Sequence, residues 1–233
     1  MSHALDGCHV VVTGGAGALG TAVVTAFVRA GAVVHVPVHG ASPPAAAAQP
    51  GVHYLPGVDL TDESAVVAFY AGLPKDLWAS VHIAGGFAMG GITETLLEDL
   101  REQFDLNLVT AFLCCREAVR RFRLRAGGDG GRIVNVAART ALQPDGGKLA
   151  YGVAKGAVVS LTESLADELK DEGICVNAIA PGTIDTPANR AAMPDADAAK
   201  FVDPHAIADV IVWLASPQNR VASGAVVPVF GRS

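Results

Sequence analysis

The sequence predicts an α/β protein with a doubly wound, seven-stranded parallel sheet that is covered by helices on both faces, in three layers. Short runs rich in valine and isoleucine alternate with amphipathic segments of helix length along the whole chain. This alternation is typical of repeated strand–helix–strand units whose parallel sheet is buried on both faces. With 233 residues and 51% hydrophobic content, the chain is expected to form a single domain over residues 1–233 around one sizeable core.

Seven apolar runs are expected to be strands, at residues 8–13, 32–38, 52–56, 79–84, 131–137, 174–179 and 225–230. Helices are expected near residues 18–30, 62–72, 95–103, 105–126, 151–171 and 204–215. Ser64, Thr95 and the pair Asp203-Pro204 support three of the starts, because these residue types are favoured at helix N-termini. Residues 40–50 are rich in proline, which argues against a full crossover helix between the second and third strands.

Composition and charge exclude several classes of function. The net charge of −6 argues against a nucleic-acid partner, since a phosphate backbone requires a basic surface. No stretch of 18 apolar residues predicts a membrane span, and no charged leader precedes an apolar segment as in a secretion signal. The four cysteines lack zinc-ligand spacing and indicate buried thiols in a reducing, cytoplasmic compartment, with no metal site.

A glycine-rich turn follows the first expected strand and precedes a helix. Gly15, Gly17 and Gly20 fit the pattern GxGxxG in this position. Glycines permit the tight turn and allow the backbone to approach a pyrophosphate, whose charge is stabilised by the free N–H groups at the helix start. The sequence therefore predicts that the sheet is of the Rossmann type and binds a dinucleotide.

Tyr151 and Lys155 lie four residues apart at the head of an expected helix, so both side chains share one helix face. A phenol has a pKa near 10, and a cation within about 4 to 6 Å favours its ionised form. The same spacing also occurs on ordinary solvated helices. In a chain with a dinucleotide loop, however, the pair indicates a centre for proton transfer.

The motifs of one known family occur in order along the chain. They are a loop like TGxxxGxG at Thr13–Gly20 with Ala18 at one of the glycines, an acid at Asp59, Ala84-Gly85, the helix asparagine Asn107, the YxxxK pair Tyr151 and Lys155, and Pro181-Gly182 with Thr186. On these motifs nearly the whole sequence resembles the short-chain dehydrogenase/reductase family. The resemblance implies a nicotinamide cofactor and oxidoreductase activity on a small molecule.

The resemblance also implies roles for individual residues. Tyr151 gives a proton to the reduced atom, Lys155 lowers the tyrosine pKa and binds the nicotinamide ribose, and Asn107 carries a relay water. The implied cofactor-binding residues are Gly14, Gly15, Gly17, Ala18, Leu19, Gly20, His39, Asp59, Leu60, Ala84, Gly85, Gly86, Tyr151, Lys155, Pro181, Gly182, Ile184 and Thr186. A loop at about 183–203 would cover the substrate, and helices 105–126 and 151–171 would pair subunits in a homotetramer or a dimer.

Two departures from the family pattern concern the cofactor and the fourth strand. Val38 occupies the place of the acid that binds the ribose hydroxyls in NAD-preferring members, and His39 occupies that of an arginine for a 2′-phosphate. Absence of the acid removes repulsion against that phosphate, so NADP(H) is favoured over NAD(H). His82 and Ile83 replace two asparagines, and His82 is expected to be a packed core histidine.

The third departure lies beside the tyrosine. The family has a serine thirteen residues before the tyrosine that donates a hydrogen bond to the substrate oxygen, and here Ala138 stands at that position. Losing one such donor typically costs roughly 2.7 to 4 kcal/mol. Either Thr140 takes over, which its position would allow if the strand stays extended, or the substrate needs no donor, or the protein is not an enzyme.

A narrower resemblance supports a substrate that needs no donor. The segments 17–20, 84–87, 151–158 and 185–194 resemble dihydropteridine reductases, which also have alanine at the serine position and reduce a quinonoid pterin. The expected function is therefore an NAD(P)H-dependent reductase of a C=N, quinonoid or carbonyl acceptor, with Ala138, Thr140 and Phe87 at the substrate. The alternatives are an ordinary ketone reductase or alcohol dehydrogenase that uses Thr140, and a non-catalytic dinucleotide-sensing or scaffold protein.

Overall fold

A computed structural model describes residues 4–41, 49–125 and 130–232 of the chain. Its seven strands are β1 (His9–Thr13), β2 (Val33–Val38), β3 (Val52–Pro56), β4 (Leu77–His82), β5 (Gly131–Val136), β6 (Ile174–Pro181) and β7 (Val226–Val229). They form one parallel sheet in the order β3-β2-β1-β4-β5-β6-β7. The order reverses between β1 and β4, which is where ligands bind in open α/β sheets. The predicted Rossmann-type, doubly wound sheet is confirmed.

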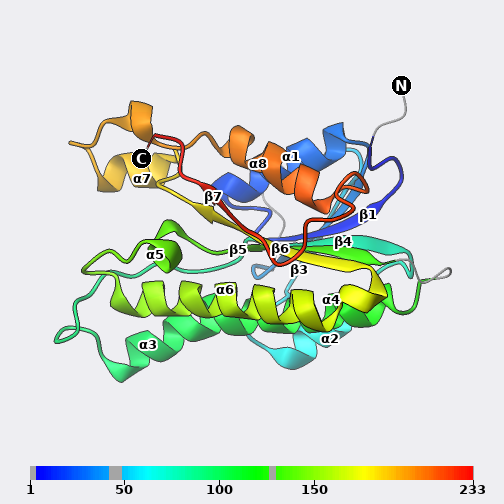
Figure 1. The fold of residues 1–233 in the computed structure, drawn as a ribbon, viewed down its shortest axis with the longest axis horizontal. Coiled ribbons are helices and arrows are strands. Elements are labelled where there is room, and N and C mark those ends of the chain that lie inside the picture. Colours follow the sequence, from blue (N-terminus) through cyan, green and yellow to red (C-terminus); the bar gives the residue numbers. More distant parts are fainter. Residues whose placement is uncertain (1–3, 42–48, 126–129, 233) are drawn as a thin grey trace.

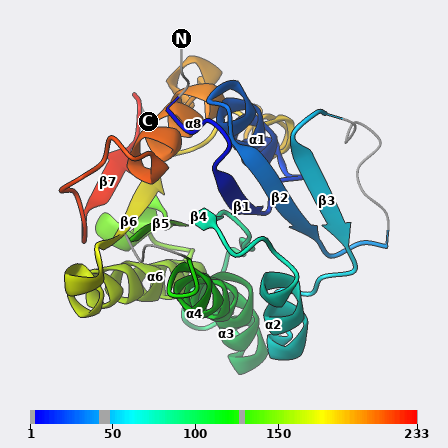
Figure 2. The ribbon, with the colours of Figure 1, turned by 90° about the vertical axis from the view of Figure 1, so that its right-hand side faces the viewer.

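Helices cover both faces of this sheet (Figures 1 and 2). Figure 2 shows α1 (Ala18–Arg29) and α8 (Pro204–Ala215) on one face, and α2 (Glu63–Ala71), α3 (Leu97–Phe104), α4 (Thr110–Phe122) and α6 (Leu149–Glu168) on the other. Two short helices, α5 (Arg139–Leu142) and α7 (Pro187–Ala192), follow β5 and β6. Among the described residues, none of the helices has the length and apolar character needed to cross a bilayer.

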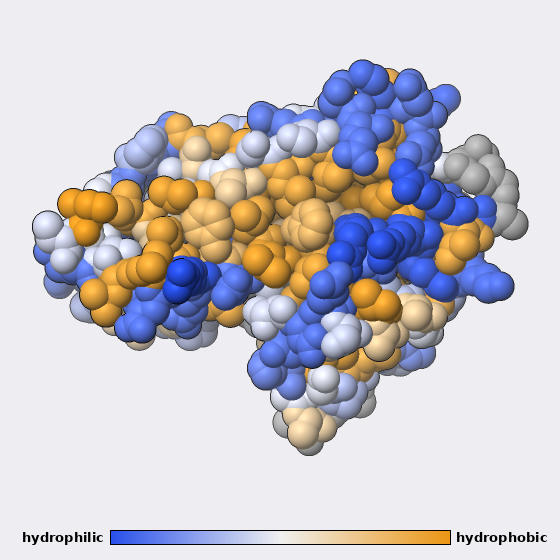
Figure 3. All heavy atoms as spheres, turned by 90° about the horizontal axis from the view of Figure 1, so that it is seen from below, coloured by the Kyte–Doolittle hydropathy of each residue, from blue (hydrophilic) through white to orange (hydrophobic). Residues whose placement is uncertain are grey.

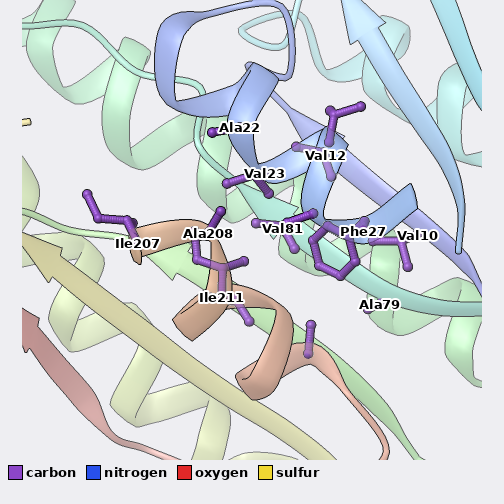
Figure 4. Close-up of a cluster of buried hydrophobic side chains, with 14 of the residues drawn as sticks. Val10, Val12, Ala22, Val23, Phe27, Ala79, Val81, Ile207, Ala208 and Ile211 are labelled. Atoms are coloured by element: carbon purple, nitrogen blue, oxygen red, sulfur yellow. The ribbon is translucent and has the colours of Figure 1, made fainter. Parts of the chain in front are cut away.

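Valines that alternate along β1 belong to two different core layers. Val10 and Val12 pack with Phe27 of α1 and Ile211 of α8 (Figure 4), whereas Val11 packs on the opposite face under α2 and α4. All three valines are fully buried, and each such side chain contributes roughly 1.5–3 kcal/mol relative to an exposed one. The strand is therefore fixed between two helical layers, and its end at Thr13 is held rigidly.

The elements agree with the predicted ranges, with three informative differences. The predicted helices 95–103 and 105–126 form one helical run in which residues Asp105–Val109 make a π-helical turn. The strand β5 ends at Val136, and a helical turn starts at Arg139. The short helix α7 was not predicted, although Thr186 followed by Pro187 is a favoured start. The expectation for the proline-rich segment falls largely on residues 42–48, outside the described part of the chain.

Candidate active site

The glycine loop between β1 and α1 leaves no room for a side chain at Gly14 or Gly20. Gly14 has a φ of +67°, and a β-carbon on it would lie 2.8 Å from the backbone nitrogen of Ala84. A β-carbon on Gly20 would collide with the carbonyl oxygen of Gly14. The hydroxyl of Thr13 accepts hydrogen bonds from the backbone of Ile83 (3.1 Å) and Ala84 (3.2 Å). The loop is thus fastened to the end of β4.

The start of α1 is open to an anion. Gly17 is its N-cap residue and has no side chain to cap the first N–H groups of this 12-residue helix. Uncapped N–H groups together with the positive end of the helix dipole stabilise phosphate charge. The loop and the helix start therefore have the open backbone that the pyrophosphate of a dinucleotide requires, and the binding roles of Gly14 to Gly20 stay a prediction.

The ends of β2 and β3 bring together the residues predicted to hold the adenosine. Backbone hydrogen bonds join Val58 to Val38 (3.0 Å) and Gly57 to Gly40 (3.0 Å). Asp59 accepts from the amide of Thr61 (2.8 Å) and from its hydroxyl (2.7 Å). These hydrogen bonds lower the pKa of Asp59, and nearby His39 lowers it further. The side chain of neighbouring Leu60 packs against the core.

The two residues predicted to carry the chemistry lie on the first turns of α6. The Lys155 ammonium is buried, lies 5.9 Å from the ring centre of Tyr151, and donates to the carbonyl oxygen of Val136 at 2.8 Å. Burial lowers the pKa of Lys155 to about 8. Burial also raises the pKa of Tyr151 to about 12, so the expected lowering is wrong for this structure. Desolvation outweighs an ammonium that is held toward Val136, and the phenol is in its proton-donating form.

The π-helical turn before α4 places the side chain of Asn107 near Lys155, on the other side of Gly85. Its side-chain amide donates to the carbonyl oxygens of Gly86 (3.1 Å) and Gln103 (3.0 Å), and its oxygen accepts from the amide of Gly86 (3.3 Å). A β-carbon on Gly85 would lie 2.5 Å from the Asn107 oxygen and 3.4 Å from the Lys155 nitrogen. Gly85 therefore separates the asparagine from the lysine, and π-helical turns of this kind are frequent at functional sites.

The alanine at the serine position lies where β5 leaves the sheet. Ala138 is buried and extended, and α5 starts at the next residue. The condition under which Thr140 would share the strand face is therefore not met, because the backbone turns helical at Arg139. Thr140 instead packs beside Gly152, 3.9 Å from the place of an added β-carbon. Its hydroxyl is buried and has no hydrogen-bond partner among the described residues.

An aromatic side chain and the segment after β6 complete this edge of the sheet. The ring of Phe87 meets that of Tyr151 edge-on, with centroids 5.0 Å apart, and 59% of Phe87 is exposed. The backbone of Gly182, next to Pro181, donates to Val229 (3.2 Å). Thr186 caps α7 by accepting from Asn189 (3.1 Å). In the predicted substrate loop, Ile184 pairs with Val202 in a β-bridge.

Sequence comparison places this geometry in a family. The sequence profile of the family described as short chain dehydrogenase matches residues 8–197. The chain belongs to this family. The chain is accordingly an NAD(P)-dependent oxidoreductase.

Two enzymes and one solved structure illustrate the similarity. Sorbitol dehydrogenase of Cereibacter sphaeroides is 35% identical over 78% of this chain and 72% of its own. D-threitol dehydrogenase of Mycolicibacterium smegmatis is 31% identical over 97% of this chain and 93% of its own. The structure of ElxO with NADP bound superposes with a TM-score of 0.89 at 24% identity, covering 97% and 98% of the two chains, which shows the shared fold.

In this short-chain dehydrogenase, His82 is part of the core, as predicted. Its ring nitrogens lie 2.9 Å from the Ser80 hydroxyl and 2.8 Å from the Asn135 side-chain oxygen. Ser80 in turn contacts the Tyr70 hydroxyl (2.8 Å), and Asn135 donates to Thr162 (3.0 Å). This chain of polar groups ties β4 and β5 to the helices around them. Sequence reasoning did not find it, because hydrogen-bonded partners within it lie up to 53 residues apart.

Burial of neutral His82 predicts a loss of stability in acid. Its pKa is lowered from 6.5 to about 4 by burial, so below pH 6.5 the unfolded chain binds a proton that the folded chain does not. The free energy of unfolding should therefore fall between pH 6.5 and 4, by about 3 kcal/mol for this residue. Buried His35, whose pKa is also lowered to about 4, should add to the loss.

Urea unfolding across this pH range can isolate the contribution of His82. A His82→Gln variant should lose about 3 kcal/mol less stability than the parent chain between pH 6.5 and 4. His205→Gln, an exposed substitution at the start of α8, is the control and should keep the parental slope. Equal slopes in the His82 variant and the parent would contradict a neutral, buried His82.

Proposed function

We propose that this short-chain dehydrogenase is a reductase that transfers hydride from NAD(P)H to a C=N, quinonoid or carbonyl acceptor, with Tyr151 as the proton donor. The observation that carries this proposal is the Tyr151 phenol next to the buried Lys155 ammonium at the carboxyl edge of the sheet, where burial raises the pKa of the phenol. The exposed ring of Phe87 flanks that phenol. A proton donor of this kind completes a reduction once a hydride has reached the acceptor.

Different residues of the chain have different roles in the proposed reaction. When bound, the nicotinamide cofactor supplies the hydride. The loop at Gly14–Gly20 holds its phosphates, and Lys155 orients its ribose, as the family resemblance implies. Tyr151 then gives its proton to the acceptor heteroatom. Asn107 would hold a water that connects Lys155 to solvent, from which the proton is replaced. We favour NADP(H) over NAD(H), because β2 ends in Val38 with exposed His39 after it, so no carboxylate there repels a 2′-phosphate.

Ala138 narrows the class of acceptor. A buried alanine at the serine position cannot donate a hydrogen bond to a developing oxyanion. An acceptor that needs a proton more than oxyanion stabilisation, such as a quinonoid dihydropteridine or a cyclic imine, suits this site. Phe87 offers such a planar ring an exposed aromatic wall.

A second candidate is an ordinary ketone reductase or alcohol dehydrogenase in which Thr140 serves as donor. The unpartnered, buried hydroxyl of Thr140 next to Gly152 favours it, because buried polar groups normally have a partner. The third candidate is a dinucleotide sensor or scaffold without turnover. This third candidate is disfavoured by the presence of Tyr151, Lys155 and Asn107, because a sensor has no chemical use for a proton relay.

Steady-state oxidation of NADPH and of NADH separates these candidates. Quinonoid dihydropterin, a cyclic imine and a simple ketone would each be offered to the enzyme. We expect turnover of the first two with NADPH. Turnover of the ketone alone would favour the Thr140 mechanism, and tight cofactor binding without any turnover would favour the sensor.

Introducing the missing hydroxyl is the sharper test. Ala138→Ser should raise ketone reduction by up to about 10²- to 10³-fold relative to reduction of the quinonoid or imine acceptor, because only the ketone develops an oxyanion. The ratio of kcat/KM values for the two acceptors measures the effect. Ala141→Ser, three residues further on, controls for a nonspecific effect of the hydroxyl. A large gain on both acceptors would contradict the proposed acceptor class.

We further propose that the chain acts in the cytoplasm as a homotetramer or a dimer. Figure 3 shows a broad apolar area on the side of the molecule that carries α3, α4 and α6. Phe112 of α4 and Val153 of α6 are 46% and 49% exposed, and apolar faces of this size commonly mark interfaces. Light scattering that gives the mass of a monomer, 23.8 kDa, would contradict this assembly.

A further inference from the structure

An arginine stands next to the alanine that replaces the serine. Arg139 is the first residue of α5, directly after Ala138, and its side chain is exposed. Its guanidinium carbon lies 5.5 Å from the ring centre of Phe230, and its Nε donates to the side chain of Gln143 at 3.0 Å. Two contacts thus hold the guanidinium in place, and neither uses its terminal nitrogens.

These contacts carry the guanidinium across the carboxyl edge of the sheet. Phe230 directly follows β7, and Val229 before it accepts the hydrogen bond from Gly182. By the family resemblance, Pro181-Gly182 belongs to the segments that bind the cofactor. Arg139 therefore starts beside Ala138 and just before Thr140, which packs against Gly152 next to Tyr151, and its side chain reaches Phe230 beside the cofactor segment. Figure 1 shows α5, α7 and the C-terminal segment at this same end of the sheet.

The charge of Arg139 has no carboxylate partner within ion-pair distance among the described residues. The carboxylates of Asp145 and Asp185 form ion pairs with other residues, namely Lys148 and Arg190. Arg139 adds only to the effect of Lys148 in lowering the pKa of Asp145. In a chain with a net charge of −6, an exposed arginine that two contacts fix in place directly after Ala138 offers a position for binding an anion.

We propose that Arg139 binds a carboxylate of the substrate through its two terminal nitrogens and so selects acidic acceptors. The inference rests on the proposed function, because it places the carboxylate on the molecule that Tyr151 protonates. A planar guanidinium matches the two oxygens of a carboxylate, and a single guanidinium balances a single negative charge. The contact with Phe230 and the hydrogen bond from Nε to Gln143 orient the guanidinium before the substrate binds. This orientation lowers the conformational entropy that is lost on binding.

Matched probes test this selection on the full enzyme with NADPH. Benzoylformate and its methyl ester share the keto group and the ring but differ in charge. We expect kcat/KM to favour the acid by on the order of ten- to a hundredfold, and Arg139→Gln to bring the ratio close to one. Arg29→Gln removes the same charge on α1, from a residue paired with Asp209, and should keep the parental ratio. Equal rates for acid and ester in the parent enzyme, or a preference that survives in Arg139→Gln, would overturn the proposal.

If neither ketone is reduced, a binding measurement tests the role of Arg139 instead. Benzoate and benzamide have the same shape and differ in charge, and their affinity for the NADPH complex is read from the cofactor fluorescence. Benzoate should bind at least about tenfold more tightly to the parent enzyme, and this advantage should vanish in Arg139→Gln. Equal affinities would refute the role of Arg139, whereas the absence of turnover alone would count against the proposed reductase activity.

Discussion

Replacing Tyr151 with phenylalanine is expected to lower kcat by about 10²- to 10⁴-fold while the protein stays folded and binds NADPH. Among the described residues at this edge, the Tyr151 phenol is the group that lies beside a buried ammonium, and burial raises its pKa to about 12. Phenylalanine keeps the edge-on contact with Phe87. The loss should therefore appear in turnover and not in the unfolding transition.

A second variant separates loss of the proton from loss of the site. Lys155→Met removes a buried ammonium that donates to Val136, and an unsatisfied buried carbonyl costs about 1–3 kcal/mol. This variant should lose turnover and stability together, as measured by kcat and by urea unfolding. If Tyr151→Phe kept more than about a tenth of the parental kcat, the proton would come from another group, and the proposed mechanism would fail.

The parts of the site that follow local sequence rules could be predicted. Val10 to Val12 are apolar on both faces of a strand, and the glycines after Thr13 require a tight turn. The helical spacing of Tyr151 and Lys155 likewise depends only on residues within one turn. For such residues, local pattern and final structure agree because packing reinforces the local preference.

Long-range contacts decided the features that could not be predicted. Lys155 was expected to act on the tyrosine, but its ammonium finds the carbonyl of Val136, nineteen residues earlier in the chain. Thr140 would have shared the strand face only if the backbone stayed extended, but the backbone becomes helical at Arg139 and places Thr140 beside Gly152. No pattern of neighbouring residues predicts either contact, because each contact depends on how α5 and α6 pack against the end of β5.

The second large effect is expected for a substitution in the glycine loop, at Gly20. Gly20→Ala places a methyl group against the carbonyl oxygen of Gly14 and near the α-carbon of Gly15. Both obstacles are backbone atoms, so the clash is relieved only if the loop and the start of α1 move apart. Overpacking of this kind typically costs about 1–3 kcal/mol. Because the displaced groups are those that would hold the phosphates, most of the cost should appear in cofactor binding.

The expected result for Gly20→Ala is NADPH binding weaker by about ten- to a hundredfold, read from a fluorescence titration. Gly146→Ala is the matched control, because a β-carbon there meets nothing within 4 Å and Gly146 has no positive φ. It should bind NADPH as the parent chain does. Unchanged affinity in Gly20→Ala would mean that the phosphates do not lie on this loop. The assignment of the carboxyl edge of β1 to the cofactor, on which the roles of Tyr151 and Arg139 depend, would then have to be abandoned.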